Sequence, residues 1–276
     1  MSANLSSAES STAASPTDTG AREPVLLRAD AGGVVRLTLN RPRQYNALND
    51  DLLAALQREL DAIAGDDAVR VVVIAAAGEA FCPGHDLKEM RAAHSQAQHE
   101  DLFARCSRMM RSIVELPKPV IARVQGMATA AGCQLVATCD LAVASTQATF
   151  AVSGVNLGLF CSTPSVALSR NVTRKRAFEM LVTGEFIDAG RAVEYGLVNR
   201  AVPPQRLDAE VDSLCRVILS KPQIAIETGK RVFYRQLERD LKDAYTLTGE
   251  AMACNMMAPD TVEGVDAFLQ KRPPKW

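Results

Sequence analysis

The sequence has few of the residues that bind metals, form disulfides or contact nucleic acids. It has only three histidines, and its seven scattered cysteines include no CxxC pair. A metal site or a disulfide framework therefore has little to build on, and the thiols are typical of reduced cysteines in a cytoplasmic protein. A net charge of −1 argues against nucleic acid as a partner. No apolar run reaches the roughly 18 residues that a membrane span requires.

Residues 1–22 have almost no large apolar side chains and are rich in Ser, Ala and Thr. Such a segment cannot bury enough surface to offset the entropy of ordering, so we expect a disordered tail. It has no apolar core of a secretory signal, and Glu9 and Asp18 fit a transit peptide poorly. The rest of the chain is long enough for one sizeable core with an appendage.

The patterns of strand and helix alternate in the first two-thirds of the chain and become purely helical afterwards. Strands are predicted at 25–30, 34–40, 71–77, 120–124, 141–144 and 149–152, and helices at 50–64 and from about 85 to 115. Further helices are predicted at 165–170, 174–182, 188–195, 205–219, 222–238 and 241–255. This segregation indicates an α/β core with an added helical layer.

The stretch VQGMATAAGCQLVATCD, residues 124–140, predicts a strand that turns into a helix through small residues. Thr129 is the expected N-cap, and Ala131 and Gly132 lie in the first turn. The free backbone N–H groups of a helix start suit an anion or a developing oxyanion, and small side chains permit close approach. The alternative interpretation is a close-packed helix of an α/β core.

A second stretch, AFCPGHDLKEM at residues 80–90, predicts a turn after a buried strand, followed by a helix. Gly84 permits an unusual backbone angle, and Asp86 can cap the helix. The N–H of His85 falls at this turn. Two such N–H groups, from separate turns, that converge on one oxygen would form an oxyanion hole.

Four segments resemble the enoyl-CoA hydratase/isomerase (crotonase) superfamily. They are LNRPRQYNAL at 39–48, AFCPGHDLKEM at 80–90, QGMATAAGCQLVATCDLAVAS at 125–145 and AFLQKRPPKW at 267–276. Their order and spacing are similar to those of enoyl-CoA hydratase domain-containing proteins. The resemblance implies an α/β fold: a crotonase (ClpP-like) spiral of ββα units in residues 23–200 and a C-terminal helical trimerisation region in residues 201–276. It implies a homotrimer, or a hexamer of two trimers.

The same resemblance implies an acyl-CoA thioester as ligand, with coenzyme A as part of the substrate and no further cofactor. The thioester oxygen would lie between the N–H groups of His85 and Ala131. The expected CoA-binding positions are Arg43, Ala47, Pro83, Asp86, Leu87, Lys88, Phe268 and Lys271. In many members the last two reach the site of a neighbouring subunit. Taken singly and without the family pattern, Arg43, Lys88 and Lys271 are better interpreted as solvated surface charges, and Phe268 as ordinary core.

The sequence departs from the family where hydratases carry two catalytic glutamates. These positions fall on Gln134 and Gly154, and the acid that isomerases place eight residues later falls on Ser162. No carboxylate occurs between Asp140 and Glu179. An amide cannot abstract a proton at neutral pH, and each general acid–base group contributes roughly 10²–10⁴-fold to rate. Strong hydration of an enoyl thioester is therefore not expected, and restoring both glutamates should raise it.

The polar side chains that remain as candidates are His85, Gln134, Asn156, Cys161, Ser162 and Thr163. The imidazole of His85 is the only ordinary acid–base group near the expected oxyanion hole, unless it faces outward from a turn chosen for its backbone. Cys161 has no nearby base and is interpreted as a structural thiol. Gln134 either positions a water or is a satisfied core amide.

Two functional hypotheses follow from these residues. One is an enzyme of fatty-acid metabolism, nominally an enoyl-CoA hydratase/isomerase of the lyase class, that stabilises an enolate without the glutamate pair. The other is a non-catalytic acyl-CoA-binding or regulatory protein. Turnover of crotonyl-CoA beside the affinity for a saturated acyl-CoA distinguishes them.

Overall fold

The computed structural model describes residues 23–276, so the tail predicted at residues 1–22 lies outside the described residues. Its main sheet has six strands in the order β1-β2-β3-β4-β6-β9, parallel except for the β1–β2 hairpin. These strands are Leu26–Ala31, Val34–Leu39, Val71–Ala76, Val120–Val124, Leu141–Ser145 and Arg200–Val202. Gly32 and Gly33 make the hairpin turn with positive φ, as their lack of a side chain permits.

A second, three-stranded sheet lies beside the functional segments. It has the order β5-β7-β8, and its strands are Ala128–Thr129, Thr149–Ala151 and Ile187–Asp188. Strands β5 and β8 of this sheet, and β9 of the main sheet, were not predicted from the sequence. Each is only two or three residues long, and such short strands carry too little periodicity to recognise.

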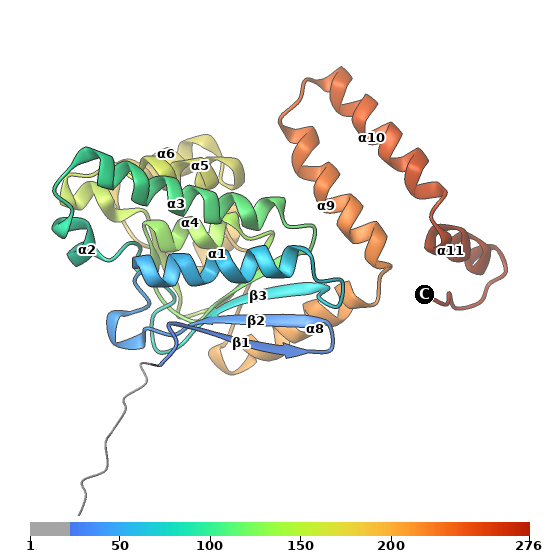
Figure 1. Cartoon of the computed structure of the whole chain (residues 1–276), viewed down its shortest axis with the longest axis horizontal. Helices are drawn as coiled ribbons and strands as arrows, with labels where there is room; N and C mark the ends of the chain where they lie inside the picture. Colours follow the sequence, from blue (N-terminus) through green and yellow to red (C-terminus); the bar gives the residue numbers. More distant parts are fainter. Residues whose placement is uncertain (1–22) are drawn as a thin grey trace, which may run out of the picture.

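Helices cover the main sheet on both faces (Figure 1). On one face lie α1 (Asp50–Ala64), α3 (Gln96–Glu115) and α4 (Ala131–Thr138). On the other lies α8 (Leu207–Leu219), whose Leu207 and Val211 pack on Val71 and Val143. Strand β3 is buried along its whole length, which confirms the prediction from its unbroken apolar run.

The helical region predicted from about 85 to 115 is two helices. The first is α2 (Leu87–Ala92), and α3 restarts four residues later. Ser95 and Gln98 form a capping box at the start of α3, and this box separates the two. The 3₁₀ turns are η1 (Pro42–Gln44), η2 (Ser153–Leu157) and η3 (Pro204–Arg206), and three further helices are α5 (Ser162–Asn171), α6 (Arg174–Thr183) and α7 (Ala189–Tyr195).

The last three helices form a C-terminal arm, residues 223–269, which stands away from the sheet in Figure 1. It consists of α9 (Gln223–Leu237), α10 (Leu241–Met256) and α11 (Pro259–Leu269), and α11 was not predicted from the sequence. Helix α8 follows the boundary predicted at residue 200 but packs on the main sheet. Within residues 23–276 no helix is long and apolar enough to cross a membrane.

Candidate functional site

Two segments that are far apart in the sequence run side by side at the edge of the second sheet. The N–H of Cys82 donates to the carbonyl of Met127, and the N–H of Thr129 donates to the carbonyl of Cys82, both at 3.0 Å. A Cβ on Gly132 would lie 2.0 Å from the Cys82 oxygen. Only glycine permits this approach, so Gly132 allows the start of α4 to pack directly on the segment that contains Cys82.

The same contact brings the two predicted N–H groups together. A Cβ on Gly84, which has a φ of 104°, would lie 3.2 Å from the Ala131 nitrogen. Leu48 pairs with the residues on either side of His85. Its N–H donates to the Gly84 carbonyl, and its own carbonyl accepts from the Asp86 N–H. Among residues 23–276, neither the His85 N–H nor the Ala131 N–H has a hydrogen-bond acceptor. Both backbone donors are therefore open to a ligand.

The turn before Ala131 differs from the prediction. Thr129 is not the N-cap, because it lies in β5 and its hydroxyl pairs with that of Ser153 at 2.8 Å. Ala130 takes the cap position with φ 48° and ψ −121°, and no side chain caps the helix. A non-glycine residue at positive φ is strained, and such strain concentrates at functional sites. The uncapped first turn keeps its N–H groups free.

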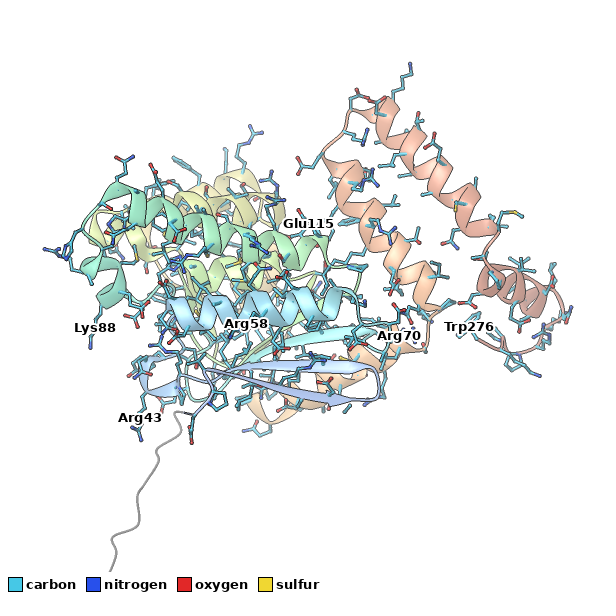
Figure 2. All side chains as sticks on the ribbon, in the orientation of Figure 1. Arg43, Arg58, Arg70, Lys88, Glu115 and Trp276 are labelled. Atoms are coloured by element: carbon cyan, nitrogen blue, oxygen red, sulfur yellow. The ribbon has the colours of Figure 1, made fainter. Side chains whose placement is uncertain are left out.

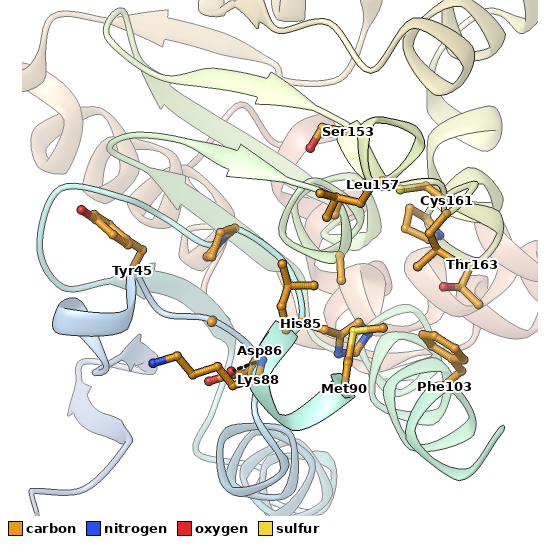
Figure 3. Close-up of a pocket in the computed structure, with 18 of the residues that line it drawn as sticks. Tyr45, His85, Asp86, Lys88, Met90, Phe103, Ser153, Leu157, Cys161 and Thr163 are labelled. Carbon is orange, nitrogen blue, oxygen red and sulfur yellow. Dashed lines mark hydrogen bonds between the residues drawn. The ribbon is translucent and has the colours of Figure 1, made fainter. Parts of the chain in front are cut away.

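Both N–H donors border a cavity of about 600 Å³ (Figure 3). Ten of the predicted site residues line this cavity: Arg43, Ala47, Pro83, His85, Asp86, Leu87, Lys88, Ala131, Gly154 and Ser162. Gln134, Phe268 and Lys271 do not. Cys161 and Thr163, which the sequence also offered as polar candidates, line it too. Residues that sequence reasoning missed complete the lining: Gln44, Tyr45, Met90, Phe103, Ala130, Ser153, Leu157, Leu159, Phe160 and Pro164. Most are apolar, and they come from turns and from helices α2, α3 and α5, so no spacing in the sequence marks them out.

One end of the cavity carries positive charge. Arg43 and Lys88 extend into solvent on the same side of the molecule (Figure 2), and neither has an ion-pair partner among residues 23–276. The carboxylate of Asp86 already has two partners. It pairs with the Arg41 guanidinium at 3.2 Å, and it caps α2 by accepting a hydrogen bond from the Lys88 N–H. Tyr45 adds an exposed ring at this end. Two free cations beside a flat ring suit the phosphates and base of a nucleotide.

The opposite end is apolar and poor in acid–base groups. Asp86 is the only carboxylate residue in the described lining of the cavity. Cys161 is buried at the start of α5, and burial raises the pKa of its thiol. The thiol is therefore protonated at neutral pH and a poor nucleophile, as the structural interpretation of this cysteine expects. Ser162 directs its hydroxyl to the carbonyl of Phe160 at 3.4 Å.

The imidazole of His85 lies in the cavity wall and does not face outward. Its ring meets Phe103 edge-on, with 5.8 Å between centroids and 75° between planes. Both ring nitrogens are buried, and within residues 23–276 the Leu48 backbone is the polar group that acts on the ring, with no hydrogen bond of normal geometry. Burial lowers the pKa of the imidazole, so the neutral form is favoured.

Phe268 and Lys271 lie at the far end of the arm. Phe268 is 83% exposed, and Lys271 follows α11 with a φ of 54°. In Figure 2 the labelled Trp276, a few residues further on, lies on the opposite side of the molecule from Lys88 and Arg43. These two residues therefore do not reach the cavity of their own chain.

Comparison with known proteins identifies the family of this chain. The sequence model of the enoyl-CoA hydratase/isomerase family matches residues 29–276. The chain belongs to the enoyl-CoA hydratase/isomerase family. It is 46% identical to enoyl-CoA hydratase domain-containing protein 3, mitochondrial, of Xenopus laevis over 253 residues, 92% of this chain and 86% of that protein. A crotonyl-CoA hydratase of Syntrophomonas wolfei is 34% identical over 86% of this chain and 91% of its own.

Solved structures of the family confirm the fold. An enoyl-CoA hydratase from Mycobacterium smegmatis is 60% identical, with a TM-score of 0.91 over 92% of this chain and 99% of that one. Human enoyl-CoA hydratase domain-containing protein 3 is 45% identical, with a TM-score of 0.89 over 91% and 100%. The crotonase fold expected from the resemblance is thus confirmed.

The comparison contradicts the prediction of a cytoplasmic protein. Relatives at 42–46% identity from frog, mouse, human and zebrafish are named as mitochondrial. The prediction rested on reduced cysteines and on the composition of residues 1–22. Neither feature identifies a cellular compartment. Reduced thiols also persist outside the cytosol, and residues 1–22 lie outside the described structure.

The two positions that matched the family's glutamates differ in their surroundings. Gln134 is buried in α4 behind the cavity, and its Oε1 has no hydrogen-bond donor among residues 23–276. Gly154 does line the cavity, but a Cβ there would lie 2.5 Å from the carbonyl oxygen of Leu159 and 2.7 Å from Cys161 Sγ. The loop that crosses Gly154 therefore excludes any larger side chain at this position.

Proposed function

We propose that this family member binds an acyl-CoA thioester in the 600 Å³ cavity and polarises its carbonyl through the N–H groups of His85 and Ala131. The observation that carries the proposal is the approach of the two turns at Gly84, which leaves both donors unbonded at the cavity wall. Preorganised donors of this kind stabilise a developing oxyanion, and one such donor is worth about 10²–10³ in rate.

The cavity suits both ends of such a ligand. Arg43 and Lys88 would hold the CoA phosphates, with Tyr45, Ala47 and Leu87 against the base and pantetheine. The acyl chain would extend toward the apolar end, between Phe103 and Leu157. Phe268 and Lys271 would complete the CoA site of a neighbouring subunit, since they lie far from their own cavity. This arrangement makes a trimer or a hexamer part of the proposed site.

Weak hydration, or none, is part of this proposal. Asp86 is the sole carboxylate of the lining and is held by Arg41. No described carboxylate is therefore free to activate water, so chemistry that needs only enolate stabilisation fits the cavity better. The same observation favours a second candidate, an acyl-CoA-binding protein without turnover.

The experiment that tests the proposal combines calorimetry with a turnover assay. We expect butanoyl-CoA to bind, and crotonyl-CoA to be hydrated well below the median enzyme rate of about 10 s⁻¹. The variants Arg43→Ala and Lys88→Ala should each weaken binding. Arg58→Ala, on the solvent-facing side of α1, serves as the matched control and should not. Absence of binding would refute the site, and hydration at the median rate would refute the role given to the missing carboxylates.

A further inference from the structure

The backbone N–H of His85 points away from Leu48 because of the hydrogen bonds on either side of it. His85 and Leu48 form an isolated parallel bridge. In this bridge the Leu48 N–H donates to the Gly84 carbonyl at 2.8 Å, and the Asp86 N–H donates to the Leu48 carbonyl at 3.0 Å. A peptide unit is planar and trans, so its C=O and N–H point in opposite directions. The bond that holds the Gly84 oxygen on Leu48 therefore aims the His85 N–H to the other side.

One side chain joins the two segments of this bridge from behind. Arg41 donates through Nη1 to the carbonyl of Ala47 and through Nη2 to the carboxylate of Asp86, the latter at 3.2 Å. Ala47 precedes Leu48 and Asp86 follows His85, so the guanidinium spans the bridge. The Arg41 side chain is only 14% exposed, and it is not among the described residues that line the cavity. Arg41 therefore holds both segments without facing a ligand.

The backbone ahead of Leu48 takes a conformation that needs such support. Tyr45 and Asn46 both have positive φ, at 52° and 64°, which is uncommon for residues other than glycine. The buried Asn46 side chain accepts the Arg41 N–H at 2.9 Å and donates to two carbonyls of the segment that follows β3. Strained conformations persist only where surrounding contacts fix them. Arg41 thus braces, through its backbone and its side chain, the turn that delivers Leu48 to the bridge.

We infer that Arg41 is a positioning residue of the proposed oxyanion hole, because its guanidinium clamps Ala47 to Asp86 and thereby sets the direction of the His85 N–H. The inference rests on the proposed function, since it concerns one of the two donors of that site. A hydrogen bond weakens steeply as its donor turns away from the acceptor, so release of the clamp weakens the polarisation of a bound carbonyl. The rigid fork of an arginine suits this task, whereas a lysine offers a single point charge.

Isotope-edited infrared spectroscopy of bound butanoyl-CoA, labelled with ¹³C at the carbonyl, tests this inference. Polarisation by the two N–H groups should lower the carbonyl stretching frequency in the wild-type protein relative to the free thioester. At saturating ligand, Arg41→Lys should lose at least about half of this downshift, because one of the two donors is misdirected. Arg41→Gln keeps a donor but has no charge for Asp86, and it should lose a similar part. Saturation makes the readout independent of any change in affinity.

Arg123→Lys is the matched control. The Arg123 side chain is similarly buried, at 17% exposure, and its fork donates to both oxygens of Asp208 at 2.8 Å. Asp208 belongs to α8, on the face of the sheet opposite to α1, α3 and α4. This substitution therefore removes a comparable ion pair without touching the bridge, and its downshift should equal that of wild type. Thermal melts establish which variants are folded.

The outcomes separate this inference from the proposed function. A wild-type downshift in either Arg41 variant, or an equal loss in Arg123→Lys, would overturn the clamp and leave the proposed function standing. Loss of folding in both Arg41 variants, beside a folded Arg123→Lys, would mean that the side chain supports the whole fold and would also overturn the positioning role. If the wild-type protein does not bind butanoyl-CoA, or binds it without a downshift, both the clamp and the proposed function fall.

Discussion

Lys230 Nζ lies 2.6 Å from Asp140 Oδ2, and this buried ion pair joins the arm to the end of helix α4. The ammonium also donates to the carbonyls of Ile113 and Lys118, at 2.9 Å each, and the Tyr234 hydroxyl donates to Asp140 Oδ1 at 2.8 Å. Lys230 is the one buried residue of α9, all of which is described. The arm is therefore attached to the core mainly through a polar contact.

Lys230→Ala should destabilise the protein strongly. Removing one partner of a buried pair leaves an uncompensated charge, at a typical cost of about 3–5 kcal/mol. Urea unfolding measures the change, and amide hydrogen exchange should show faster exchange in residues 223–269 than in the sheet. The control is Arg111→Ala, since its pair with Glu115 is exposed and worth less than about 1 kcal/mol. Equal effects of the two substitutions would contradict the anchoring role.

Gly132→Ala should lower both stability and ligand affinity. The new methyl group would lie 2.0 Å from the carbonyl oxygen of Cys82, and such overpacking costs about 1–3 kcal/mol. Relief of the contact moves the start of α4 away from the first segment, so the two N–H donors separate. Denaturant unfolding and butanoyl-CoA titration measure the two effects. Gly229→Ala, in an exposed helical position with open space around it, is the control and should be neutral or stabilising.

Gly154→Glu should fail to restore a hydratase, contrary to the expectation from sequence alone. The Leu159 carbonyl and the Cys161 thiol occupy the space that a side chain would need. We expect Gly154→Ala alone to lower the free energy of unfolding by about 1–3 kcal/mol. A crotonyl-CoA assay of Gly154→Glu with Gln134→Glu should remain near the wild-type rate. A stable double variant with a large gain in hydration would show that the loop at Leu159 and Cys161 moves to admit the side chain, and would contradict this prediction.

Stability should fall with pH below neutrality in a way that depends on His85. Its folded pKa is lowered by burial, relative to about 6.5 in an unfolded chain. A group with a lowered folded pKa binds more protons when unfolded, so its contribution is present above about pH 6.5 and is lost as pH falls below it. Urea melts at about pH 7.5 and pH 5.5 should show a smaller loss for His85→Leu than for wild type. Parallel losses would mean that the imidazole is not buried in solution.

The arm should mediate assembly into a trimer or a hexamer. Its exposed apolar side chains include Leu241 at 76%, Met257 at 81% and Phe268 at 83% exposure, and surfaces of this kind mark interfaces. Light scattering at micromolar concentration should report three or six copies, and a monomer would contradict the prediction. Mixing unfolded Arg43→Ala subunits with Lys271→Ala subunits before refolding should restore tight CoA sites if neighbours share them, and should restore none if each subunit binds alone.

The sequence by itself determined the elements that depend on local chemistry. The unbroken apolar run at Val71 predicted a strand buried on both faces, and Asp86 predicted a helix cap, as the structure confirms. The glycines and small residues of the two turns predicted open N–H groups near Gly84 and Ala131. These predictions succeeded because periodicity, capping and the freedom of glycine act over a few residues.

The tertiary structure decided everything that depends on approach between distant segments. Only the fold places Gly132 against the Cys82 carbonyl, buries the His85 ring against Phe103, and directs Lys230 to Asp140. No local pattern marks these contacts, because each joins residues brought together by packing rather than by spacing. The same reason explains why Thr129 was expected to cap a helix. Its hydroxyl had a closer partner in Ser153, which lies in another part of the chain.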